Sequence, residues 1–180
     1  MGTIKTTNIQ TITGSGTLTL GTSGETISVP SGVTFSNSGT ATGFGGGKVL
    51  QVVTATDETQ RTTTSTTFTD ITGLSVTITP SSTSSKILVT CSTSGYSGNT
   101  VAASEYTLVR GSTNLATNFI GRLFGANDLR ASITMTVLDS PATTSATTYK
   151  AQFRRSSASG TAAAQTTNSL GTITVMEIGA

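Results

Sequence analysis

Threonine alternates with aliphatic residues along much of this chain. The pattern is clear in residues 17–20 (TLTL), 77–79 (TIT) and 133–137 (ITMTV), and Thr and Ser together make up more than a third of the sequence. A period of two places apolar side chains on one face of an extended strand and hydroxyls on the other, and the branched Cβ of Thr itself favours strands. No segment has the spacing of an amphipathic helix. The sequence therefore predicts an all-β protein.

The composition divides the chain into two unequal parts. A length of 180 residues accommodates one sizeable domain and a smaller module. Before residue 48 the only charged residues are Lys5 and Glu25, and residues 37–47 are rich in glycine, which is typical of a hinge. We expect an N-terminal shaft or anchor segment, residues 1–47, followed by a C-terminal antiparallel β-sandwich head, residues 48–180.

The first 47 residues consist of short apolar stretches separated by turn residues. Strands of about four residues are too short to be stable alone, but three copies of such a chain can wind into a fibrous shaft that covers each strand edge. A flexible linker is the alternative interpretation. The candidate shaft or docking contacts are Ile9, Ile12, Leu18, Leu20, Ile27 and Val29.

The part after residue 47 has longer strand patterns at spacings of roughly ten residues, which is typical of a sandwich or jelly roll. Turn residues at 70–73, 80–82, 110–112 and 139–141 separate the runs. The predicted strands are residues 49–54, 61–72, 74–79, 86–93, 104–110, 113–120, 129–138, 147–155 and 171–178. Residues 162–165 are expected to form a turn at most.

The last predicted strand is apolar on both faces. Ile173 and Val175 share one face, and Met176 and Ile178 share the other, so both faces should be covered. We interpret these four residues as a candidate interface of a homotrimer. A β-bulge that shifts the register would produce the same string in a monomer.

The residue types needed for catalysis are scarce. The chain has no His, and its single Cys, Cys91, lies in an apolar strand pattern and is expected to be buried. The eight acidic residues are scattered, so we predict neither a metal nor a cofactor site and no enzymatic activity.

Charge and hydropathy argue against two classes of partner. The formal net charge is +2 and the basic residues are dispersed, which disfavours nucleic-acid binding. No run of 18 apolar residues and no secretory signal is present, so we expect no membrane insertion.

Polar and aromatic residues in predicted loops could contact carbohydrate. The weak candidates are Tyr96, Asn99, Arg122 and Asn127. Arrays of Thr-x-Thr can also bind ice, but the spacing of these pairs along the sequence is irregular, which disfavours that function.

Several strings resemble segments of virion fibre and tail proteins of tailed bacteriophages, particularly marine ones. They are GTLTLGTSGETISVPSG (16–32), NSGTATGFGGGKVLQVV (37–53), ITPSSTSSKILV (78–89), YTLVRGSTNLA (106–116) and LGTITVMEI (170–178). The resemblance implies a homotrimer assembled in the host cytoplasm into the virion. It also implies an N-terminal segment that docks on other virion proteins and a jelly-roll head similar to the complement and tumour-necrosis-factor type.

The resemblance leaves two functions open. Proteins of this kind act as tail or adhesion fibres that bind host surface glycans, or as head fibres and capsid decoration proteins that bind no receptor. The short N-terminal part keeps the second function as an alternative. A spike that degrades polysaccharide is disfavoured, since neither an acidic cleft nor a long β-helix is visible in the sequence.

Overall fold

The structure is a computed structural model of the chain. It describes Thr26 and residues 31–32, 48–97, 103–124, 129–156, 159–166 and 169–179. The chain divides into two compact units, Met1–Phe44 and Gly45–Ala180. The predicted shaft contacts lie outside the described residues: Ile9, Ile12, Leu18, Leu20, Ile27 and Val29.

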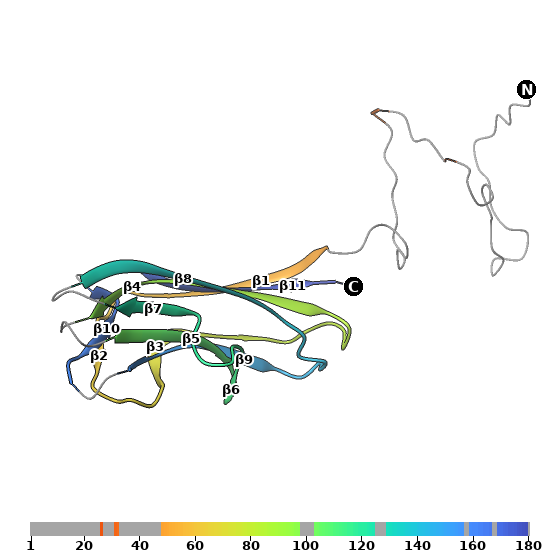
Figure 1. Ribbon diagram of the computed structural model, residues 1–180. Coiled ribbons are helices and arrows are strands. Elements are labelled where there is room, and N and C mark those ends of the chain that lie inside the picture. The colour runs from red at the N-terminus through yellow and green to blue at the C-terminus, as the bar shows by residue number, and fades with distance from the viewer. Residues whose placement is uncertain are drawn as a thin grey trace, which may run out of the picture. The chain divides into compact units, whose positions relative to one another are not determined.

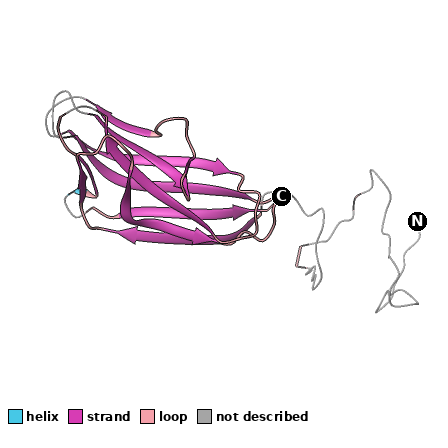
Figure 2. Ribbon diagram, turned by 90° about the horizontal axis from the view of Figure 1, so that it is seen from below, coloured by secondary structure: helices cyan, strands magenta, loops and turns pink. Residues whose placement is uncertain are grey.

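The second unit is built from strands (Figure 2). Its described ranges contain no α-helix. The alternation of aliphatic and hydroxyl side chains reappears as alternating buried and exposed positions, for example along Thr69–Ile78. The strands are β1 (Val49–Asp57), β2 (Arg61–Thr63), β3 (Thr69–Ile78), β4 (Lys86–Ser97), β5 (Ala103–Arg110), β6 (Thr113–Asn114), β7 (Gly121–Phe124), β8 (Leu129–Asp139), β9 (Thr147–Arg155), β10 (Ala162–Ala164) and β11 (Gly171–Ile178).

Two antiparallel sheets form a sandwich (Figure 1), which confirms the all-β sandwich prediction. The first sheet has the order β1-β11-β4-β10-β2, and β8 pairs with the remaining edge of β4. The second has the order β3-β9-β5-β6, and β7 also pairs with β5. Without the short strands β2, β6 and β10, the two layers are β1-β11-β4-β8 and β3-β9-β5-β7. This is the strand order of a jelly roll, in which the first long strand pairs with the last.

The core fills the space between the two layers. The stacked rings of Tyr106 and Phe153, with centroids 6.4 Å apart, occupy part of it. Other buried residues come from inward positions of both sheets, because alternate residues of each strand face the partner sheet. They include Ile71, Leu74, Val76, Ile78, Ile87, Val89, Cys91, Leu108, Met135, Tyr149, Ile173 and Val175.

Several local predictions differ from the structure. The predicted strand 61–72 is divided between β2 and β3, which belong to different sheets. The predicted turn at 70–73 lies within β3, where the register with β9 shifts between Asp70 and Ser75. Gly73, with φ of +97°, gives the backbone a conformation that other residues rarely adopt there. The predicted strand 113–120 is limited to β6, and residues 162–165, predicted to form a turn at most, include the strand β10. Local patterns predict neither β7 nor β10, because their sequences carry little alternation.

Candidate functional site

The outer face of β1-β11-β4-β8 carries three aligned rows of side chains, which we call the threonine face. Strand pairing sets these rows: Thr54 lies opposite Thr174, Thr174 opposite Thr90, and Thr90 opposite Thr136. The hydroxyls of Thr54 and Thr174 are 3.0 Å apart. The rows are Val52-Met176-Leu88-Leu138, Thr54-Thr174-Thr90-Thr136 and Thr56-Thr172-Ser92-Thr134.

The threonine face has an apolar border and no charge within its three rows. Val52 is 54% exposed and Leu138 is 55% exposed at the two ends of the apolar row. Val49 and Leu50, at the start of β1, are also exposed and extend the apolar surface toward Ile178, which pairs with Val49. Clustered apolar exposure of this kind is typical of a surface that contacts another molecule.

The candidate interface residues of the last strand separate onto two faces of β11. Ile173 and Val175 are fully buried in the core of the sandwich. Met176 and Ile178 are partly buried on the outer face, where Met176 lies in the apolar row. Of the four predicted residues, Met176 and Ile178 therefore remain accessible for contact with a second chain.

The inner face of β11 ends in a buried carboxylate rather than an apolar residue. Glu177 is fully buried and accepts hydrogen bonds from the Gln51 amide at 2.6 Å and from the backbone and hydroxyl of Ser81 at 2.7 and 2.6 Å. Burial alone would raise the pKa of Glu177, but these hydrogen bonds outweigh it and lower the pKa to about 2. The carboxylate joins β1, the β3–β4 turn and β11, so its role is structural.

The outer face of the second sheet carries a different set of side chains, which we call the arginine cluster: Arg122, Arg154, Glu105, Phe68, Phe119 and Phe124. Strand pairing places Glu105 opposite both Arg122 and Arg154. The Glu105 side chain is 5% exposed and lies 2.8 Å from Arg154 and 3.5 Å from Arg122. One buried carboxylate is thus shared by two guanidinium groups.

Aromatic rings hold both guanidinium groups of the cluster. The Arg154 guanidinium lies 4.4 Å from the centroid of the Phe68 ring, and its Nη2 also donates to Asn118 at 2.8 Å. The Arg122 guanidinium lies 5.7 Å from the Phe119 centroid and 5.1 Å from the Phe124 centroid. Cation–π contacts of this geometry restrict the orientation of the guanidinium plane.

The sequence-predicted glycan contacts do not form one site among the described residues. Arg122 belongs to the arginine cluster on the second sheet, whereas Tyr96 lies on the outer face of the first sheet, where the Arg130 guanidinium is 5.2 Å from its ring centroid. Asn99 and Asn127 lie outside the described residues.

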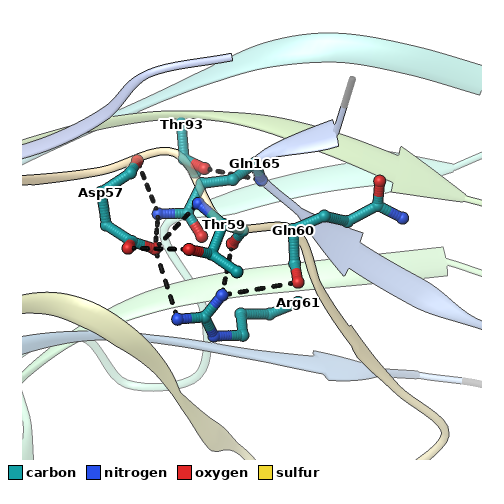
Figure 3. Close-up of polar contacts among 6 residues, drawn as sticks. All are labelled: Asp57, Thr59, Gln60, Arg61, Thr93 and Gln165. Atoms are coloured by element: carbon teal, nitrogen blue, oxygen red, sulfur yellow. Dashed lines mark hydrogen bonds and ion pairs between the residues drawn. The ribbon is translucent and has the colours of Figure 1, made fainter. Parts of the chain in front are cut away.

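A third polar cluster joins the ends of β1 and β10 (Figure 3). The Asp57 carboxylate accepts hydrogen bonds from the Thr59 backbone at 3.2 Å and from the buried Gln165 amide at 3.0 Å, and it lies 3.5 Å from Arg61. Gln165 has a φ of +53°, and its backbone N–H is 3.3 Å from the Thr93 hydroxyl. Because its oxygens already accept from neighbouring donors, Asp57 serves to fix the chain where two strands end.

The single thiol of the chain lies in the core of the sandwich. Cys91 is 1% exposed, and burial raises the pKa of its thiol to about 12, so it stays protonated. The part of the chain that the structure describes holds no group of three or more metal-ligating side chains. Within the same ranges, no helix is both long and apolar enough to cross a membrane.

Local sequence patterns do not predict the arginine cluster. Glu105, Arg122 and Arg154 are separated by 17 and 32 residues along the chain, and only the pairing of β5 with both β7 and β9 brings them together. The available signal is the spacing of Arg122 and Phe124, since residues two apart on a strand share a face.

No family model matches the chain, and no curated protein matches it. Among solved structures, a chain in the structure of infectious bursal disease virus, Gx strain, is similar to 73% of this chain at 10% sequence identity, with a TM-score of 0.41. The matched part is 37% of that viral chain, so this protein spans little more than a third of its length.

Proposed function

We propose that the protein is a non-enzymatic virion component, a trimeric attachment fibre of a tailed bacteriophage that contacts the host surface. The resemblance of its sequence to phage fibre and tail proteins motivates the proposal. The observation that carries it is the threonine face, an uncharged surface with exposed Val52 and Leu138, on the same layer as Met176 and Ile178. Such a surface suits contact between copies of one chain better than contact with water.

The two layers of the sandwich would then have separate roles. Association through the threonine face would cover the first sheet and leave the outer face of the second sheet accessible. Three copies of one weak contact site gain avidity when they engage the same cell surface. This mechanism needs no deep pocket and no reactive group.

The mass of the full-length protein in solution tests the association. We expect a trimer by sedimentation equilibrium. A chain that stays monomeric at high concentration would contradict the proposal.

Attachment is tested by the binding of fluorescently labelled full-length protein to a panel of marine bacterial strains. Saturable binding to some strains supports an attachment fibre. If the protein is a trimer that binds none of these strains, including one that the phage infects, but binds purified phage capsids, it is instead a head fibre or capsid decoration protein.

A further inference from the structure

We propose that the arginine cluster binds a carboxylated sugar of an acidic surface glycan, with Arg122 as the residue that holds the carboxylate. This inference rests on the proposed attachment function and names the ligand class and the site. Its first support is the hydrogen-bonding state of Arg122. The Nε atom lies 3.5 Å from Glu105, and the terminal nitrogens make no hydrogen bond to any other residue that the structure describes.

The exposed end of Arg122 is matched to a carboxylate. A guanidinium presents parallel N–H donors that bind a planar carboxylate through two hydrogen bonds. The Arg122 side chain is 43% exposed, so its outer edge can meet a ligand, and the flanking rings of Phe119 and Phe124 already restrict its orientation. Holding the group in place before binding reduces the entropy lost when the ligand arrives.

The charge of the cluster favours an anion. Glu105 carries one negative charge between the positive charges of Arg122 and Arg154, so the three side chains leave a net charge of +1. Arg154 directs its donors to Glu105 and Asn118. Arg122 is therefore the residue of the cluster that can offer the most hydrogen bonds to an incoming carboxylate.

The exposed ring of Phe124 adds the second element of sugar recognition. Phe124 is 63% exposed, and its ring borders the Arg122 guanidinium. An exposed aromatic face packs against the C–H face of a sugar ring, while the adjacent guanidinium holds the charged substituent. A single such site with a small net charge suits one sugar unit, whereas nucleic acid requires a row of basic residues.

The position of the cluster agrees with a surface that faces the host. At one end of the sandwich, Lys86 pairs with Ile178 and Ile178 pairs with Val49, where the chain enters the first sheet. Leu123, the neighbour of Arg122, lies beside Gly95 near the opposite end of β4. The arginine cluster thus lies toward the end of the sandwich that is distant from the entry of the chain.

The test compares the binding of the full-length protein to oligogalacturonate and to its methyl-esterified form, by isothermal titration calorimetry. We expect the acid to bind at least about tenfold more tightly than the ester, because charged hydrogen bonds are lost with the ester. Arg122→Ala should weaken binding of the acid by about tenfold, and Arg122→Lys by a smaller factor, since Lys keeps the charge but not the paired donors.

Arg130→Ala is the matched control, because Arg130 also lies over an aromatic ring, that of Tyr96, but on the other sheet. It should change the affinity by less than about twofold. Equal loss in the Arg122 and Arg130 variants, equal binding of acid and ester, or binding of neither would overturn the inference. Thermal melting of each variant identifies any loss of affinity that is caused by misfolding. If Arg122→Ala misfolds, Phe124→Ala provides an independent variant for which we expect the same loss of affinity.

Cell binding separates this inference from the proposed function. If the wild-type protein and Arg122→Ala bind a host strain equally, the attachment function stands and the assignment of the arginine cluster fails. If the wild-type protein binds no strain, the attachment function itself fails.

Discussion

The Tyr106 hydroxyl donates a hydrogen bond to the backbone carbonyl of Ala163 at 2.6 Å, linking the second sheet to the first through the core. The same oxygen accepts a hydrogen bond from the backbone N–H of Tyr96 at 3.2 Å. Burial raises the pKa of Tyr106 to about 12, so the hydroxyl keeps its proton at physiological pH. One side chain therefore satisfies a carbonyl on β10 and an N–H on β4.

Tyr106→Phe is expected to lower the free energy of unfolding by about 1–3 kcal/mol, since it leaves a buried carbonyl without its donor while the ring remains in place. Urea denaturation followed by circular dichroism measures the change. An unchanged midpoint would mean that the hydroxyl makes no net contribution to stability.

Gly73→Ala is expected to destabilise the sandwich by more than about 1 kcal/mol. The φ of Gly73 is +97°, and a Cβ at this position would lie 2.6 Å from the Asp57 Cβ, so the substitution adds both strain and a steric clash. The matched control is Gly111→Ala, where φ is also positive but no atom lies within 4 Å of the added Cβ. Thermal unfolding should show a larger loss at Gly73 than at Gly111.

Glu177→Gln should remove an acid-dependent part of the stability. The pKa of Glu177 is about 2 in the folded protein against an ordinary value of 4.5, so its ionised form stabilises the fold fully above pH 4.5, and this contribution is lost as the pH falls toward 2. At pH 7 the substitution should cost about 1–3 kcal/mol, because an amide cannot accept from all the donors that surround the carboxylate.

The measurement is the free energy of unfolding of both proteins between pH 7 and pH 2. The difference in unfolding free energy between the two proteins should shrink as the pH falls. Asp70 is another carboxyl whose pKa is lowered, but it is present in both proteins, so the difference reports the contribution of Glu177 alone. A difference that is constant with pH would contradict the assignment.

Thr174→Arg should convert the proposed trimer to monomers. Thr174 lies on β11 in the middle row of the threonine face, and an unpaired charge buried at an interface costs about 3 kcal/mol or more. Thr77→Arg is the control, because Thr77 also bonds to a threonine across the strand, Thr148 at 2.8 Å, but on the second sheet. Sedimentation velocity should show monomers for the first variant and trimers for the second; the reverse result would place the interface on the second sheet.

The sequence predicted the sandwich because alternation is a local property. Strands such as Lys86–Ser97 and Thr147–Arg155 carry their burial pattern in their own residues. The last strand is harder to interpret, since Met176 and Ile178 suggest an apolar second face. The inner position between them is occupied by Glu177, and its partners Gln51 and Ser81 are distant in the sequence.

The candidate surfaces depend on register, which local patterns do not contain. The Thr-x-Thr pairs are irregularly spaced along the chain, yet antiparallel pairing aligns Thr54, Thr174, Thr90 and Thr136 in one row. Glu105 meets Arg122 and Arg154 for the same reason. Residues that lie far apart in the sequence thus form surfaces that only the strand order determines.

The pairing of the first long strand with the last has a mechanical consequence. The pairs extend from Val49 opposite Ile178 to Asp57 opposite Gly171. A head tethered at residue 48 and held by a cell at its far end would be pulled along β1, parallel to the strand axis. Such a load would shear all the backbone hydrogen bonds of the ladder together instead of peeling them one at a time, so under the proposed attachment function the pairing of β1 with β11 would resist a pull along this direction more strongly than a pull across it.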